Sequence, residues 1–172
     1  VGIRTNIIER INREISRQQQ HGDGYLAFKL NSLVDKASIQ ALYRASQAGV
    51  KIELMVRGMC GLRPGIPGLS QTITVTSLVG RFLEHSRCFY FRNGGQDELF
   101  LGSADLMPRN MDRRVEILFP IENPTLRTFI VETILRPYLK DNMHTRQLQA
   151  DGTYTRVKPS EGEASFQAQE WF

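Results

Sequence analysis

The chain has 172 residues, of which 41% are hydrophobic and 23% are charged, so it is long enough for one core and short for two. With 22 lysines and arginines against 18 aspartates and glutamates, the formal net charge of +4 is too small for a nucleic-acid coat. The cationic excess is mostly arginine and lies near the motifs described below, which favours a local anion-binding pocket.

The number of cysteines and the length of the hydrophobic runs indicate the cellular compartment of the protein and whether it spans a membrane. Cys60 and Cys88 are too few for a disulfide framework and fit a reducing cytoplasm. No run approaches the roughly 20 apolar residues that a membrane-spanning helix requires. The start, Val1-Gly2, is neither a signal peptide nor an initiator methionine, and we expect the chain to be a fragment of a longer one.

The first part of the chain predicts a helix followed by a strand–helix–strand unit. Apolar residues at helical spacing predict an amphipathic helix over residues 4–19. Next come a short apolar strand over 25–30, a helix over 35–48 that Gly49 ends as a left-handed cap, and a strand over 50–56. This order indicates a parallel crossover.

A glycine-rich loop over 57–68 follows the second strand and carries Arg57 and Arg63. Open α/β sheets bind ligands in loops at the carboxyl ends of parallel strands. Glycines let backbone amides face an anion closely, and the two arginines supply charge for a phosphate chain or nucleotide. The structural alternative is a flexible connector whose arginines face water.

The pattern that points most sharply to chemistry is His85 and Arg87, two residues apart. After a short strand over 73–76, we expect both at the start of a strand that runs on to Phe91, where they share a face. A histidine can transfer a proton or attack phosphorus, and a guanidinium can neutralise phosphoryl oxygens. Ser103, in a later Gly-Ser turn, adds a hydroxyl. The alternative is a lone surface histidine beside a solvated arginine.

The second half predicts further strands and one long helix. A tight turn over 92–95 leads to a strand over 98–101, and residues 110–116 lead into a strand over 117–120 with Arg114 near its start. An N-cap at Asn123 precedes a helix over 125–139. A hairpin with strands over 145–149 and 153–157 follows, and we expect residues 145–172 to be peripheral.

These motifs together resemble the carboxyl-terminal catalytic domain of the long-chain, ATP-dependent polyphosphate kinase. The resemblance is carried by residues 29–35, 56–58 with 62–68, 80–87, and 102–110 with 112–116, and by the tail over 151–154 and 168–171. It implies an α/β fold: a phospholipase D-like mixed β-sheet flanked by helices on both faces. It also implies one such domain over residues 1–172, cut from a longer polyphosphate kinase.

The resemblance further implies reversible transfer of the terminal phosphate of ATP to polyphosphate, with Mg²⁺ accompanying ATP and a phosphohistidine in a preceding domain. His85 matches the family's second essential histidine, and Arg57 and Arg114 match arginines that contact nucleotide phosphates. We also expect Arg63, Arg87 and Ser103 to bind phosphate, and no residue here to bind metal. The fragment alone is expected to be inactive; the implied partners are ATP or ADP, polyphosphate and preceding domains in a cytoplasmic homo-oligomer.

Two positions depart from the pattern, and two alternatives stay open. Arg87 stands where phospholipase D-like enzymes carry lysine, which argues against ordinary phosphodiester hydrolysis, and Gly61 stands where we expect cysteine. The alternatives are a phospholipase D-like phosphodiesterase or nuclease acting as a dimer, and a non-catalytic module that binds polyanions through its arginines. The mild charge counts against nucleic acid, and peripheral association with a membrane stays open.

Overall fold

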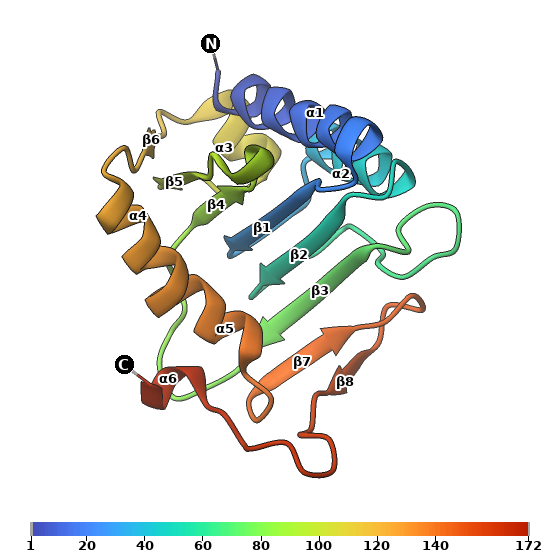
Figure 1. Ribbon diagram of the computed structural model, residues 1–172, viewed down its shortest axis with the longest axis vertical. Coiled ribbons are helices and arrows are strands. Elements are labelled where there is room, and N and C mark those ends of the chain that lie inside the picture. Colours follow the sequence, from blue (N-terminus) through green and yellow to red (C-terminus); the bar gives the residue numbers. More distant parts are fainter. Residues whose placement is uncertain (1, 172) are drawn as a thin grey trace.

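The computed structural model describes residues 2–171, which form one mixed eight-stranded sheet with helices on both faces (Figure 1). The elements of the first half are α1 (Ile3–His21), β1 (Tyr25–Leu30), α2 (Lys36–Gln47), β2 (Lys51–Val56), β3 (Ile73–Leu78), β4 (Cys88–Phe91), a 3₁₀ turn (Asn93–Gly95) and β5 (Glu98–Gly102). Those of the second half are α3 (Pro108–Arg113), β6 (Leu118–Pro120), α4 (Pro124–Ile130), the π-helical turn η2 (Val131–Leu135), α5 (Arg136–Lys140), β7 (Thr145–Leu148), β8 (Tyr154–Arg156) and α6 (Ala168–Trp171).

The order of strands across the sheet is β6-β5-β4-β1-β2-β3-β7-β8. Strands β1, β2 and β3 are parallel, and every other neighbouring pair is antiparallel. The predicted mixed sheet and parallel crossover are therefore confirmed. Because β1, β2 and β3 point the same way, their carboxyl ends meet at one edge of the sheet, and the loop that carries His85 begins there.

Helices α1 and α2 cover one face of the sheet and enclose the larger hydrophobic cluster. Ile7 and Ile11 of α1 pack there with Phe28 of β1, whose ring meets the rings of Phe89 and Phe91 edge-on at 5.1 and 5.3 Å between centroids. Burial of each such side chain stabilises the fold by about 1.5–3 kcal/mol. This cluster fixes β1 between its neighbours and holds the strands that carry the site.

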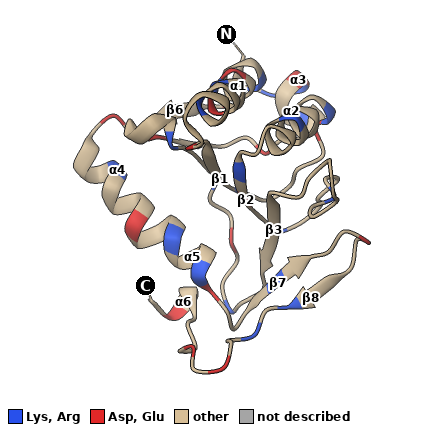
Figure 2. Cartoon of the chain, turned by 45° about the vertical axis from the view of Figure 1, so that its right-hand side comes forward, with Lys and Arg blue, Asp and Glu red and all other residues tan. Residues whose placement is uncertain are grey.

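Helices α4 and α5, joined by η2, cover the opposite face (Figure 2). Met55 and Tyr90 of the sheet are buried there against Val131 and Leu135. The Asn123 side chain accepts a hydrogen bond of 3.0 Å from the backbone N–H of Leu126, which confirms the predicted N-cap. Both faces are therefore covered, as predicted.

Two sequence-based predictions of local structure are wrong. Strand β4 begins at Cys88, so His85 and Arg87 lie in the preceding loop and not at a strand start. The ladder between β1 and β4 ends at the Lys29–Cys88 pair, and the Asn31 backbone N–H just beyond it donates to Asp105 Oδ1 and not to residues 85–87. The sequence predicts that residues 110–116 lead directly into a strand, but the first four of them belong to α3, which runs from Pro108 to Arg113.

The segment after α5 returns to the sheet and to the loop that carries His85. Strand β7 pairs with β3, and Leu148 joins the larger cluster. Helix α6 lies beside α5 and the loop between β3 and β4 (Figure 1). Among residues 2–171, no helix is long and apolar enough to cross a membrane.

Candidate active site

The site lies where the carboxyl ends of the parallel strands meet the loop before β4. Arg57 follows β2 directly; its backbone N–H donates to the Leu30 carbonyl at 3.2 Å, and its carbonyl accepts from Ser77 Oγ at 3.2 Å. These bonds tie the ends of β1, β2 and β3 together. Arg57 lines a cavity of about 20 Å³ together with Lys29 and Glu84.

His85 and Arg87 meet in this loop, although not through strand periodicity. The imidazole is exposed, and its Nδ1 lies 3.3 Å from Arg87 Nη1. The same Nη1 donates to the His85 carbonyl at 2.9 Å. Arg87 thus folds back and contacts both the ring and the backbone of His85, which leaves the histidine open to a ligand from solvent.

Asp105 fixes the Arg87 guanidinium. Its Oδ1 accepts from Nε at 3.3 Å and its Oδ2 from Nη2 at 3.1 Å, while both side chains are largely buried. Oδ1 also accepts from the backbone N–H groups of Asn31 and Ser32 at 2.7 and 3.2 Å. Two-point pairs of this kind are among the strong hydrogen bonds of proteins. Arg87 is therefore held rigidly, which suits it to orient His85.

Asn31 contacts both Arg87 and Glu84, which lie on either side of His85 in the loop. In the amide orientation that satisfies both of its polar atoms, its oxygen accepts from Arg87 Nε and Nη2 at 2.9 and 2.7 Å. Its nitrogen then donates to the Glu84 carbonyl at 2.9 Å. The end of β1 thus contacts the residues on both sides of His85.

A buried ion pair lies behind the histidine. Lys29 Nζ is 3.0 Å from Glu84 Oε2, with side-chain exposures of only 6% and 10%. Nζ also donates to Ser86 Oγ at 2.8 Å and lies 4.8 Å from the centroid of the Tyr138 ring. Tyr138 Oη donates to Glu84 at 3.0 Å, and burial together with this bond raises the pKa of Tyr138. The two neighbours of His85 are thus anchored to β1 and α5.

Sequence reasoning missed this ion pair as a part of the site. The available signal was a lysine inside an otherwise apolar strand, Tyr25–Leu30. A buried lysine needs a partner, since an isolated buried charge is costly. Neither Glu84 nor Tyr138 is near Lys29 in the sequence, so the strand alone could not name the partner.

Ser103 lies close to the site, but its hydroxyl is engaged. Ser103 Oγ donates to Glu116 and accepts from the Ile117 backbone N–H at 3.1 Å. Asn110 also donates to Glu116, at 2.5 Å. Hydrogen bonds from Ser103 and Asn110, together with the charges of Arg114 and Arg87, hold the pKa of Glu116 below its usual value. Glu116 thus lies within the field of both arginines.

The other predicted arginines differ in their surroundings. Arg114 is exposed directly after α3, and neither its side chain nor that of Arg57 has a hydrogen bond or salt bridge among residues 2–171. Arg63 lies elsewhere, beside α2 and the turn between β7 and β8. Its backbone N–H donates to Tyr43 Oη at 2.9 Å, and its charge acts on Asp151. Arg87 thus contacts His85, Arg57 shares a small cavity with Glu84, and Arg114 acts on Glu116 together with Arg87, whereas Arg63 lies apart.

The carboxylates near His85 do not fit a metal site. Asp105 pairs with Arg87, Glu84 pairs with Lys29, and Glu116 accepts from Ser103 and Asn110. Within residues 2–171, no three His, Cys, Asp or Glu side chains are grouped as a metal ion would require. The oxygens that Mg²⁺ prefers are thus already used by protein donors.

The amino-acid sequence is similar to that of known polyphosphate kinases. Residues 1–169 match the model of the family described as polyphosphate kinase C-terminal domain 2. The chain is 52% identical over 168 residues to a polyphosphate kinase of Rhodopirellula baltica, covering 98% of the chain and 20% of that protein. It is 52% identical over 158 residues to a polyphosphate kinase of Pseudomonas aeruginosa, covering 92% of the chain and 23% of that protein.

Solved structures give the same relationship. The crystal structure of polyphosphate kinase from Porphyromonas gingivalis superposes with a TM-score of 0.93 at 41% identity, covering 98% of this chain and 26% of that one. Nuc, a phospholipase D family member from Salmonella typhimurium, superposes with a TM-score of 0.55 at 14% identity, covering 79% and 88%, which shows a shared fold alone. The chain spans about a quarter or less of these curated relatives, and it belongs to the polyphosphate kinase C-terminal domain 2 family.

Proposed function

We propose that this domain supplies the His85 half of a polyphosphate kinase active site. The reaction is reversible transfer of the terminal phosphate of ATP to polyphosphate, and relatives named polyphosphate kinase match nearly the whole chain. The observation that carries the proposal is the exposed His85 ring, 3.3 Å from an Arg87 guanidinium that Asp105 holds in place. A fixed cation beside a titratable ring suits a reaction that displaces negative charge.

The residues divide into three roles in this proposal. His85 acts as a general acid or base, or stabilises the transferring phosphoryl group, while a histidine of a preceding domain carries the covalent phosphate. Arg57 and Arg114 bind phosphate oxygens, because both guanidinium groups lack protein partners among the described residues. Arg87 is largely occupied by Asp105 and positions His85.

The wider setting is part of the same proposal. ATP or ADP, polyphosphate and the preceding domains of a homo-oligomeric chain are its partners, and Mg²⁺ arrives with ATP. A cytoplasmic location is supported by two free cysteines. Burial raises the pKa of the Cys88 thiol to about 12, which leaves it unreactive.

The test is ATP-dependent polyphosphate synthesis by the intact kinase that contains this domain. His85→Gln should lower the rate by about 10²–10⁴-fold, the contribution typical of a positioned acid or base. His21→Ala, at the exposed end of α1, is the matched control and should keep the parent rate. Retained synthesis in His85→Gln, or robust synthesis by residues 1–172 alone, would contradict the half-site proposal. Hydrolysis of bis-nitrophenyl phosphate that depends on His85 would favour a phosphodiesterase.

A further inference from the structure

The loop that carries His85, residues 79–87, has little backbone support. The Val79 N–H donates to the His144 carbonyl at 3.1 Å, and the Arg87 carbonyl accepts from the Gly102 N–H at 3.4 Å. Between these two residues, no backbone–backbone hydrogen bond holds the loop within the described part of the chain. Phe82 and Leu83 are 61% and 77% exposed. Side chains must therefore set the position of this loop.

Gln169 of α6 supplies one such support. Its Oε1 accepts from the Phe82 N–H at 2.9 Å, and its Nε2 donates to the Phe82 carbonyl at 2.8 Å. Nε2 also donates to Glu84 Oε1 at 2.5 Å. One side-chain amide thus pairs with both backbone groups of Phe82, as a neighbouring strand would, and reaches the residue next to His85.

Gly80 gives independent evidence for this close approach. A Cβ atom at Gly80 would lie 2.2 Å from Gln169 Oε1 and 2.7 Å from its Cδ. Real Cβ atoms do not approach other heavy atoms so closely, so any larger residue would displace the amide. The loop therefore has a glycine where the Gln169 side chain passes.

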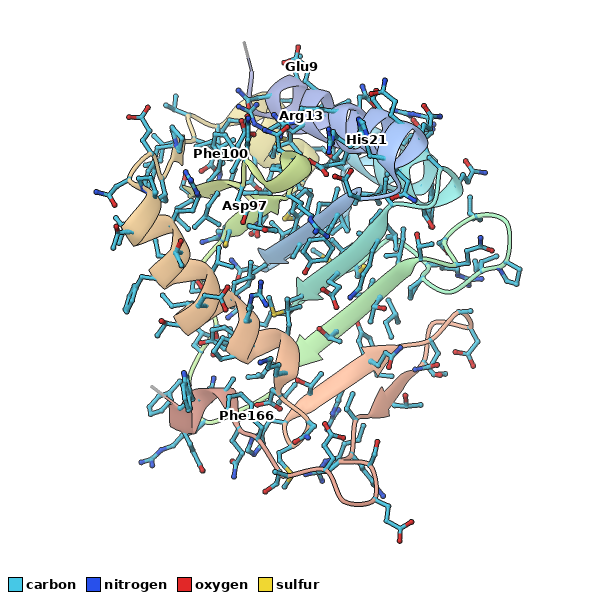
Figure 3. All side chains as sticks on the ribbon, in the orientation of Figure 1. Glu9, Arg13, His21, Asp97, Phe100 and Phe166 are labelled. Carbon is cyan, nitrogen blue, oxygen red and sulfur yellow. The ribbon has the colours of Figure 1, made fainter. Side chains whose placement is uncertain are left out.

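Gln169 is itself held firmly at the end of α5. The N–H of its neighbour Ala168 donates to Asp141 Oδ2 at 2.8 Å, and both of these residues are buried. The Phe166 N–H donates to Asn142 Oδ1 at 2.8 Å, and the Phe166 ring, labelled beside α6 in Figure 3, lies 5.8 Å from that of Trp171. The amide is thus presented from a fixed backbone.

We propose that Gln169 is a positioning residue for His85. It fixes Phe82 and the Glu84 carboxylate, which also accepts from Tyr138 and pairs with Lys29, so the chain reaches His85 in one arrangement. The α6 segment thereby controls the geometry of the histidine through its contacts with the loop. The inference rests on the proposed role of His85 in phosphoryl transfer.

The test compares Gln169→Ala, Gln169→Glu and the control Glu170→Ala in the intact kinase. Glu170 is exposed, and within residues 2–171 its side chain makes no hydrogen bond or ion pair with the loop. In both Gln169 variants, kcat should fall by about a hundredfold, the loss typical of a displacement of about 1 Å in a reacting group, with the KM for ATP unchanged. Amide hydrogen exchange over residues 79–87 should accelerate, while other segments keep their protection.

Gly80→Ala should also break the contact between Gln169 and the loop, because the added methyl group would displace the Gln169 amide while residue 169 itself is unchanged. It should reproduce the faster exchange and the lower kcat even if Gln169→Ala unfolds. Unchanged exchange in the folded variants, or faster exchange with parent kcat, would overturn the inference. If His85 proves dispensable, the exchange measurement still reports whether Gln169 holds the loop, so the failure of the proposed function is distinguishable.

Discussion

Arg87 Nη2 lies 3.1 Å from Asp105 Oδ2, and this pair connects the loop before β4 to the turn after β5. The same aspartate accepts hydrogen bonds from two backbone amides at the end of β1. A single buried carboxylate thus sets the relative position of three segments around His85. Sequence patterns suggest Arg87 as a phosphate ligand, but in the structure its guanidinium group already forms an ion pair with Asp105.

Asp105→Asn should therefore impair the site without removing any group that contacts substrate. The amide keeps the shape of the carboxylate but loses its charge, so Arg87 should turn toward solvent and His85 should lose its neighbour. We expect a loss of about 1.5–3 kcal/mol of unfolding free energy, as for hydrogen bonds to a charged group, and a lower kcat. Urea denaturation and steady-state kinetics measure the two effects, with Glu161→Gln as the exposed control. An unchanged kcat would show that Arg87 needs no anchor.

The buried pair of Lys29 and Glu84 should behave non-additively. Lys29→Met leaves an uncompensated carboxylate in the interior, which costs about 3–5 kcal/mol. Adding Glu84→Gln removes that charge, and the double variant should recover part of the loss. Denaturant titrations of the parent, both single variants and the double variant measure the coupling. Additive losses would mean that water or Tyr138 compensates each charge separately.

Ser103→Ala separates a structural hydroxyl from a substrate ligand. Because the hydroxyl donates to Glu116 and accepts from Ile117, its loss should cost about 1 kcal/mol of stability. The pKa of Glu116 should rise toward its ordinary value, since the Ser103 hydrogen bond is the largest cause of its depression. The KM for ATP should stay at the parent value. A large rise in this KM, with unchanged stability, would instead make Ser103 a direct phosphate ligand.

Arg4 should make stability sensitive to acid. It lies 2.9 Å from Asp35, the N-cap of α2, and 2.6 Å from Asp112 of α3. Burial alone would raise the pKa of Asp35, but Arg4 and the Ser38 donors outweigh it and hold the pKa below its ordinary value of 3.8. A depressed pKa gives stability that is present above the unfolded-state value and is lost as the pH falls through the folded-state value.

In Arg4→Met, the free energy of unfolding should therefore be lower at neutral pH and should fall less steeply below about pH 4 than in the parent. Thermal melts from pH 2 to pH 7 provide the comparison, and Arg44→Met, on α2, is the control. Parallel curves for Arg4→Met and the parent would show that this contact does not couple to titration.

Sequence patterns identified the central part of the fold because local rules govern it. The apolar strands β1 and β2 flank a helix followed by Gly49, whose φ of +92° is the predicted left-handed conformation. The start of β4 and the helix α3 were missed for a physical reason. A strand ends where its neighbours stop pairing, and a six-residue helix has too few turns to show a periodic apolar face.

The candidate site divides in the same way. His85, Arg87 and Arg57 stand out from residue type and neighbours within a few positions. Asp105, Tyr138 and Gln169 do not, because their contacts with the loop join residues 18 to 87 positions apart. Arg63 follows a suitable strand but turns toward α2, where Tyr43 binds its backbone. Spacing therefore indicates the chemistry, while long-range packing decides which side chains take part.

Gln169 is synthesised long after the loop that carries His85, so the contact between them forms late in synthesis of the chain. Strands β1, β2 and β3 and the helices α1 and α2 that cover one of their faces all precede residue 79, so this part of the core can begin to form before the rest of the domain is synthesised. The amide that secures Phe82 emerges about ninety residues later, which at about 5–20 residues per second is a delay of several seconds. A nascent chain that lacks Gln169 would lack the amide that pairs with the Phe82 backbone. Synthesis of α6 is therefore needed before the loop that carries His85 has its side-chain support.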